Sequence, residues 1–144
     1  CDNMQIIVDD NNLNFSSVNG ALYNKDKTYL IRVPQNATTF TLDGKVEVIN
    51  NWAFTGCVNL ESITIPSSIK CIGYKAFSNC TSLTEITIEA LSIPVLNQSA
   101  FPDSLINIYV PTELVESYKD TETLDSSLNY THWTNYSDII TAIV

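Results

Sequence analysis

The chain has 144 residues, of which 44% are apolar, enough for one domain with a core of its own. Sixteen acidic and seven basic residues give a net charge of −9. This balance argues against nucleic acid or an anionic membrane surface as a partner, because both are bound through clustered Lys and Arg. A single histidine makes histidine-based metal sites and Ser–His or Cys–His catalysis hard to assemble.

The polar composition favours β-structure. Asn, Ser and Thr together number 44, and Ile, Val and Thr together number 41. β-Branched side chains fit a pleated sheet, while Asn and Ser form hydrogen-bonded turns. No apolar run approaches the ~18 residues of a membrane helix, so we expect no direct membrane insertion.

The first eight residues allow two interpretations. Cys1 followed by an acid is consistent with the lipidated start of a lipoprotein. Alternatively, residues 1–4 echo residues 57–60, with Ile6 and Val8 as inward strand positions of a partial repeat. We favour the second interpretation because the match continues past the cysteine, and we then expect the chain to be the C-terminal piece of a longer protein.

The next segment predicts a β-hairpin. Apolar residues at 21–23 and 29–33 flank a polar turn at 24–27, and Pro34 ends the second strand. We therefore expect an antiparallel strand pair near the N-terminal end.

The middle of the chain repeats with a period of 23 residues. A shift by 23 places Ala53-Phe54 on Ala76-Phe77 and Cys57 on Cys80, and seven further positions between residues 42 and 65 agree. The pattern recurs at Ala100-Phe101 with an offset of 24 and without the cysteine. One unit cannot bury its apolar side chains alone, so the repeat predicts a solenoid whose stacked coils share a core.

Each unit contains a short strand. Period-two alternation directs Ile63 and Ile65 inward and Thr64 outward. The repeat then predicts parallel strands at about 61–65, 84–88 and 107–110. Cys57 and Cys80 stack inside the coil, where we expect buried, unpaired thiols because side chains stacked in parallel seldom give a good S–S torsion. A disulfide is the alternative, since stacked residues ~5 Å apart are within bridging range.

Residues 111–144 predict a cap over the last coil. A short helix follows Pro111 with Thr112 as its N-cap, residues 121–132 form a loop and residues 139–144 form a last strand. The large apolar groups of this segment are Leu114, Tyr118, Trp133, Tyr136 and the run from 139 to 143. We expect Trp133 and Tyr118 to pack over the last coil, with the indole N–H bonded to a loop carbonyl.

The same end is acidic, with eight carboxylates against Lys119 alone after residue 88. A charged end keeps solenoids from stacking on one another, and this is the interpretation that we favour. Capture of Ca²⁺ by Asp120, Glu122 and Asp125 is the alternative, although the spacing lacks the Gly and the terminal Glu of an EF-hand loop.

The repeat unit also has a specific resemblance. The pattern C-x-x-L-x-x-I-x-I-P-x-x-I-x-x-I-G-x-x-A-F, carried by residues 57–77, resembles the BspA-like leucine-rich repeats of bacterial surface proteins. Residues 19–31 resemble a hairpin that these proteins often insert between repeats, and residues 108–143 resemble their closing segment. The departures are Asp43 in place of a usual Pro, Cys71 in place of a small polar residue, and the missing third repeat cysteine.

The resemblance implies a leucine-rich repeat right-handed solenoid, β-rich with short parallel strands, an inserted β-hairpin and a C-terminal helical cap. We expect a single domain over residues 1–144. Its parts are a partial repeat with the hairpin at 1–33, repeats of about 23 residues at 34–110, and the cap at 111–144.

The resemblance further implies a non-catalytic module for surface recognition or adhesion, secreted or on the cell surface, that binds a host or matrix protein or glycan. The expected ligand-binding surface is the strand side of the coils. Its outward positions are Glu61, Ser62, Thr64, Thr84, Glu85, Thr87, Asn107 and Tyr109. We expect a monomer with no catalytic residues, no metal and no cofactor, since neither a G-x-S-x-G motif nor a Gly-rich phosphate loop occurs.

Two alternatives to this function stay open. With only two and a half clear repeats, the strand side of the solenoid forms a shallow concave surface for a ligand. The chain can therefore instead be a structural spacer of a larger surface protein. A more distant alternative is an accessory domain of a carbohydrate-active enzyme.

Overall fold

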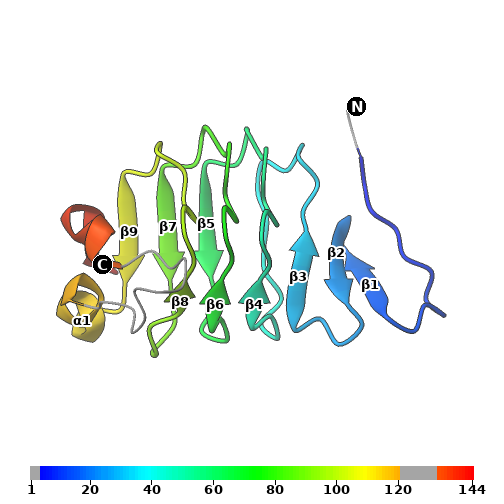
Figure 1. The fold of residues 1–144 in the computed structure, drawn as a ribbon, viewed down its shortest axis with the longest axis horizontal. Helices are drawn as coiled ribbons and strands as arrows, with labels where there is room; N and C mark the ends of the chain where they lie inside the picture. Colours follow the sequence, from blue (N-terminus) through cyan, green and yellow to red (C-terminus); the bar gives the residue numbers. More distant parts are fainter. Residues whose placement is uncertain (1–3, 121–132) are drawn as a thin grey trace.

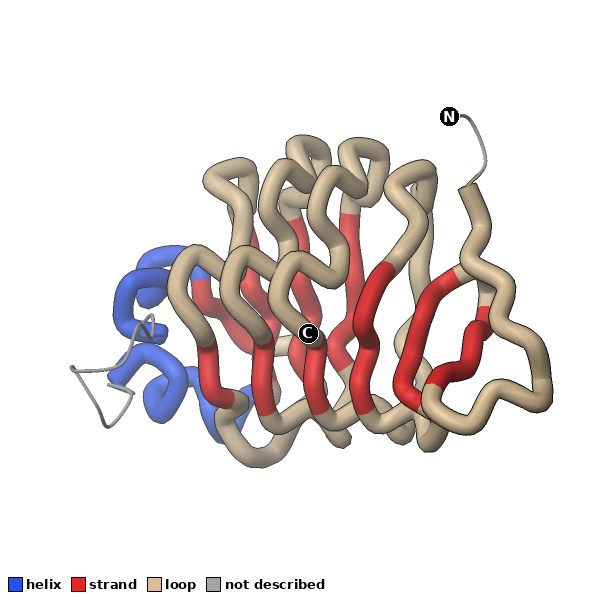
Figure 2. The backbone as a smooth tube through the Cα atoms, turned by 45° about the vertical axis from the view of Figure 1, so that its right-hand side comes forward, coloured by secondary structure: helices blue, strands red, loops and turns tan. Residues whose placement is uncertain are grey.

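The computed structural model describes residues 4–120 and 133–144. These residues form a solenoid of about four turns, with a hairpin at one end and helices at the other (Figure 1). Each complete coil contributes strands to two sheets, one on each side of the solenoid (Figure 2). The predicted solenoid with an inserted hairpin and a helical cap is confirmed.

One sheet contains the strands that the alternation predicted. Its order is β10-β9-β7-β5, all parallel, with bounds β5 (Ser62–Ile65), β7 (Glu85–Ile88), β9 (Asn107–Val110) and β10 (Ile140–Ala142). Ile63 pairs with Ile86, and Ile86 pairs with Ile108. The predicted strand pairing and the predicted last strand are therefore confirmed.

A second, six-stranded sheet forms the other side. Its members are β1 (Phe15–Val18), β2 (Ala21–Asn24), β3 (Tyr29–Arg32), β4 (Val48–Ile49), β6 (Cys71–Ile72) and β8 (Val95–Leu96). Strands β1 to β3 pair antiparallel, whereas β3, β4, β6 and β8 pair parallel. The second hairpin strand is thus also the first parallel strand of this sheet. The sequence pattern predicted β2 and β3, but it missed β1 and the two-residue strands.

The core is a column of side chains from equivalent positions of successive coils. Phe54 and Phe77 stack with ring centroids 4.6 Å apart and planes inclined by 13°, and Phe101 follows with a centroid 5.9 Å from that of Phe77. Phe54 and Phe77 are fully buried. Because each coil contacts mainly its neighbours, the stability of the column depends on every coil in it.

Among the described residues, three short helices close the far end: η1 (Thr112–Leu114), α1 (Val115–Asp120) and η2 (Trp133–Ile139). Trp133 and Tyr118 are fully buried, with ring centroids 5.1 Å apart in an edge-to-face contact. The Trp133 ring lies 5.8 Å from that of Phe101, and its N–H donates to the Pro94 carbonyl at 2.7 Å. The predicted plug and its indole hydrogen bond are confirmed.

One detail of the predicted cap is wrong. Pro111, not Thr112, is the N-cap of η1, and it makes no side-chain capping bond. The Thr112 hydroxyl donates instead to the Ile143 carbonyl at 3.4 Å, so it ties the helix to the end of β10. The predicted loop at 121–132 lies outside the described residues.

The N-terminal segment runs alongside the hairpin. Residues 4–14 contain no strand. The Ile6 N–H donates to the Gly20 carbonyl at 2.9 Å, and the Val8 N–H donates to the Ser17 hydroxyl at 2.9 Å. The division of residues 1–33 into a partial repeat and a hairpin stays a prediction, because residues 1–3 lie outside the described part.

Two coils approach each other closely at Gly73, and Gly73→Ala should lower the urea concentration at the midpoint of unfolding. A Cβ atom there would lie 2.6 Å from the backbone carbon of Asn50 and from the backbone nitrogen of Asn51. Overpacking of this kind costs ~1–3 kcal/mol. Gly44→Ala is the matched control, because a Cβ at Gly44 meets nothing within 4 Å. Equal midpoints for the two variants would contradict the close stacking.

Candidate functional site

The outward side of β5, β7 and β9 brings most of the predicted site residues together. Strand pairing aligns them in rows across the sheet because successive coils are in register. One row is Ser62, Glu85 and Asn107, and the next is Thr64, Thr87 and Tyr109. We call this surface the strand face. Its side chains are exposed or half-buried, while the alternate residues Ile63, Ile86 and Ile108 point into the core.

The remaining two predicted residues form a third row just before the strands. The Thr84 N–H donates to the Glu61 carbonyl at 3.0 Å, and the Ile106 N–H donates to the Thr84 carbonyl at 2.8 Å. Glu61 is exposed and Thr84 is half-buried. All eight predicted residues therefore occupy three adjacent coils.

The strand face carries negative charge. Glu61 and Glu85 are its charged members, and the Tyr109 hydroxyl lies 3.4 Å from the Glu85 carboxylate. Desolvation first, and then the Glu85 carboxylate, raise the pKa of Tyr109. The Tyr109 hydroxyl therefore donates to the carboxylate of Glu85 on the adjacent strand.

The sequence pattern missed four residues that extend the strand face. Thr141 of β10 pairs with Tyr109 and continues its row, and Ile106 is an exposed apolar neighbour. On the other side, Thr39 and Thr41 line an open cleft of about 370 Å³ together with Ser62 and Thr64. The 23-residue shift that relates Thr64 to Thr87 also places Thr41 at the equivalent position. The repeat in the sequence was therefore sufficient to predict Thr41 as an outward residue.

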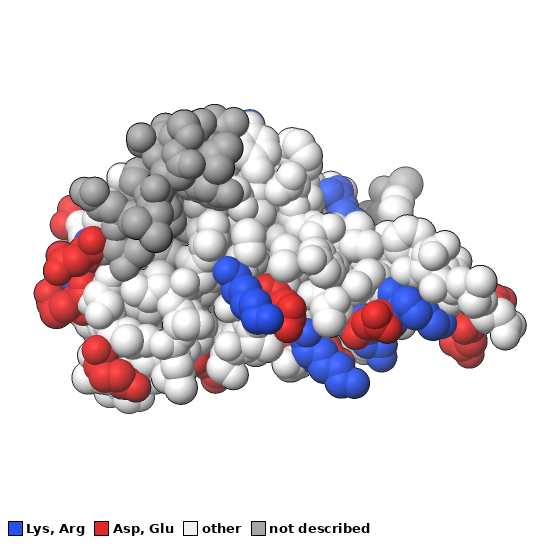
Figure 3. Space-filling model, turned by 60° about the horizontal axis from the view of Figure 1, so that its bottom comes forward, with Lys and Arg blue, Asp and Glu red and all other residues white. Residues whose placement is uncertain are grey.

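Charge is distributed unevenly along the solenoid. Figure 3 shows Lys and Arg side chains interleaved with acids over the middle and the hairpin end of one face, whereas the helical end carries mainly Asp and Glu. After residue 88, the described acids are Glu89, Asp103, Glu113, Glu116, Asp120 and Asp138, against Lys119. Within residues 4–120 and 133–144, no three His, Cys, Asp or Glu side chains gather where they could hold a metal ion. Glu122 and Asp125 of the alternative calcium site lie outside the described residues.

The repeat cysteines are buried and unpaired, as predicted. The Cys57 thiol donates to the Pro34 carbonyl at 3.6 Å, and the Cys80 thiol donates to the Phe54 carbonyl at 3.1 Å, so each links its coil to the preceding one. Interaction with the neighbouring Cys80 thiol, followed by burial, raises the pKa of Cys57, and the same pair interaction lowers the pKa of Cys80. Cys71 is half-buried and accepts a bond from the Asn97 amide at 3.4 Å, and burial raises its pKa. Because Cys57 and Cys80 are buried, these two thiols are suited to packing rather than to nucleophilic chemistry.

In the described part of the chain, no helix is long and apolar enough to cross a membrane. His132 lies outside that part. The strand face, whose outward side chains are aligned across three coils, is the candidate functional site.

Comparison with protein families identifies the repeat. A model of the BspA-type leucine-rich repeat region matches residues 30–140 in six copies. The chain belongs to the BspA-type leucine-rich repeat family. Repeats of the BspA type are generally non-catalytic and are generally involved in surface interaction or protein binding. BspA-type proteins are typically bacterial surface or secreted proteins.

Solved structures share the fold of this chain. A leucine-rich repeat protein from Eubacterium ventriosum is 24% identical over 74% of this chain and 36% of that one, with a TM-score of 0.50. The pneumococcal vaccine antigen PcpA is 18% identical over 98% of this chain and 50% of that one, with a TM-score of 0.53. A leucine-rich repeat protein from Bacteroides capillosus is 22% identical over 91% and 99%, with a TM-score of 0.56. At these identities the likeness shows the fold alone, and no curated protein matches the chain.

Proposed function

We propose that this BspA-type domain is a non-catalytic recognition and adhesion module of a bacterial surface or secreted protein. Its ligand is a host or matrix protein or glycan bound on the strand face. The observation that carries the proposal is the register of β5, β7 and β9, which lines up the outward side chains of three coils in parallel rows. A rigid, preorganised surface of this kind loses little conformational entropy on binding.

The chemistry of the strand face favours a protein ligand. Ser, Thr, Asn and Tyr side chains supply adaptable hydrogen bonds, and the exposed Ile106 adds an apolar contact. The charged members are acids, so a ligand surface with Lys or Arg is complementary. Such binding should weaken as salt screens the exposed charges.

An array of extracellular-matrix proteins and glycans, probed with this chain, tests the proposal. We expect binding that a Thr64→Ala/Thr87→Ala/Tyr109→Ala variant reduces by at least about tenfold, because the central row then lacks its hydroxyls. The matched control is Asn11→Ala/Lys45→Ala/Asn59→Ala, which changes three exposed residues away from the strand face. Equal loss in both variants, or no binding to any arrayed ligand, would favour the spacer function instead.

A further inference from the structure

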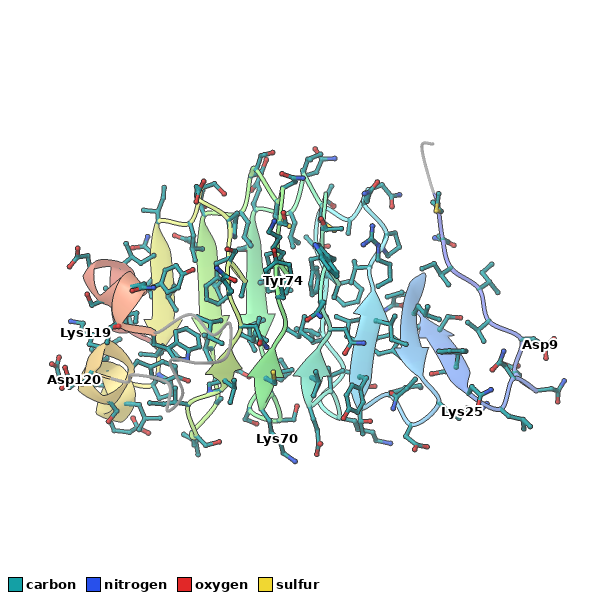
Figure 4. The ribbon with its side chains drawn as sticks, in the orientation of Figure 1. Asp9, Lys25, Lys70, Tyr74, Lys119 and Asp120 are labelled. Atoms are coloured by element: carbon teal, nitrogen blue, oxygen red, sulfur yellow. The ribbon has the colours of Figure 1, made fainter. Side chains whose placement is uncertain are left out.

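A second surface lies at the end of β3 and on the turns that follow β4 and β6. Its centre is Trp52, whose side chain is 45% exposed although it is one of only two tryptophans. We call the set Arg32, Trp52, Tyr74 and Lys75 the aromatic–basic edge. Tyr74 lies midway along the solenoid, away from Lys25 near the hairpin end and from Lys119 and Asp120 of α1 (Figure 4).

Trp52 is not required by the fold at its position. It adopts the left-handed conformation with φ 55°, and the equivalent positions of the next two coils, Lys75 and Ser99, have φ 49° and 54°. The turn therefore accepts small or polar side chains. A bulky residue is unfavourable in this region of backbone space, and an exposed indole gives little burial in return. A strained backbone conformation at an exposed aromatic residue indicates that this residue has a role other than packing in the core.

The backbone holds the two aromatic rings together. The Trp52 N–H donates to the Tyr74 carbonyl at 3.1 Å, and the Tyr74 N–H donates to the Asn51 side-chain oxygen at 2.9 Å. The rings meet edge to face with centroids 5.3 Å apart. Gly73 permits this approach, because any side chain there would collide with the Asn50–Asn51 backbone. The ring pair is thus a rigid platform at the surface.

Two cations flank the platform. The Arg32 guanidinium donates to the Trp52 carbonyl at 2.9 Å, and the Lys75 ammonium lies 5.3 Å from the centre of the Tyr74 ring. Neither forms an ion pair with a described carboxylate. The turn segments 50–56, 73–79 and 97–101 contain no Asp or Glu, although acids outnumber bases sixteen to seven in the chain. The aromatic–basic edge is therefore a locally positive site on an acidic protein.

Amide and hydroxyl groups surround the same edge. The Asn51 side-chain oxygen accepts the Tyr74 N–H, and Gln98 follows in the next coil, where its backbone carbonyl accepts the backbone N–H of Lys75 at 3.2 Å. Beyond Lys75 the surface continues into an open cleft of about 380 Å³. Its polar lining consists of Lys75, Ser78, Asn79, Thr81, Ser99, Asp103 and Ser104.

We propose that the aromatic–basic edge binds a carboxylated pyranose of an acidic glycan, that is, a hexuronic or sialic acid unit. The C–H face of the sugar ring packs on the exposed indole, and the carboxylate pairs with Arg32 and Lys75. The hydroxyl groups bond to the amides of Asn51 and Gln98, and neighbouring sugars extend toward the polar cleft. This site is separate from the strand face and does not depend on the function proposed for it.

Titration calorimetry with two acidic probes, an oligogalacturonate and sialyllactose, tests this proposal against lactose and poly-L-glutamate. We expect at least one acidic sugar to bind at least about tenfold more tightly than lactose and poly-L-glutamate. Trp52→Ala should abolish this binding while the melting temperature stays near that of the parent, because the indole is partly exposed and lies outside the buried core. Arg32→Ala and Lys75→Ala should each weaken it and reduce its salt dependence.

Matched variants separate this site from other effects. Lys45→Ala removes an exposed cation elsewhere, and Phe15→Ala removes an exposed ring on β1, so both should bind like the parent. The Thr64/Thr87/Tyr109 triple variant should also bind the acidic sugar like the parent, even if it loses binding of another ligand at the strand face. Binding to neither acidic sugar, equal binding of poly-L-glutamate, or unchanged binding by Trp52→Ala would overturn the proposal.

Discussion

Trp133→Ala should lower the melting temperature by roughly 10 °C or more, because the indole closes the end of the core. Its side chain is fully buried between Tyr118 and Phe101, and its N–H bonds the Pro94 carbonyl at 2.7 Å. Truncating a buried Trp costs ~3–5 kcal/mol. A domain of this size has a total stability of only ~5–15 kcal/mol. Differential scanning calorimetry measures the shift.

Trp52→Ala is the matched control for this experiment, since it makes the same substitution at an exposed indole. Trp133→Phe keeps a ring in the plug but removes the hydrogen bond to Pro94, so its melting temperature should lie between those of the parent and Trp133→Ala. Should Trp133→Ala melt like the parent, the residues after α1 would be an appended tail rather than a cap.

Phe77→Ala should have an effect of similar size, a loss of ~3–5 kcal/mol in the free energy of unfolding. Phe77 is fully buried in the middle of the column, with Phe54 on one side at 4.6 Å and Phe101 on the other at 5.9 Å. Its removal leaves a cavity that faces two coils at once, and a solenoid has no other contacts to compensate. Urea unfolding followed by far-UV circular dichroism measures the loss.

Phe15→Ala provides the comparison, because that ring lies on the edge strand β1 and is 42% exposed. We expect a loss below ~1 kcal/mol there. If both phenylalanine variants lose the same stability, the continuous column is not the main source of cohesion between coils.

The repeat was predictable from sequence because its physical cause is local and periodic. Ala-Phe, Cys and Ile recur every 23 residues. Each of these residues therefore lies beside the equivalent residue of the next coil, as Ile63 lies beside Ile86. The inward and outward directions then follow from alternation. The cap was predictable for a different reason: after β9, few large apolar groups remain to cover the exposed end of the core.

Other elements needed the three-dimensional structure. The strands β4, β6 and β8 have two residues each, which is too short for an alternating pattern. Strand β1 begins with an exposed Phe and pairs only with β2, so its apolar content does not mark it as a strand. The role of Thr112 was mispredicted because a bond to the distant Ile143 carbonyl replaces the expected local cap.

The candidate surfaces divide in the same way. The sequence alone determined the solenoid, its inward column and the outward rows of the strand face, because a fixed period specifies which residues neighbour one another in successive coils. Only the tertiary structure decided the aromatic–basic edge. Trp52 and Tyr74 occupy different positions of the repeat, and their contact depends on a left-handed turn and on the close approach of two backbones at Gly73. Arg32 reaches the same edge because the hairpin joins the parallel sheet, a pairing that no periodic pattern encodes.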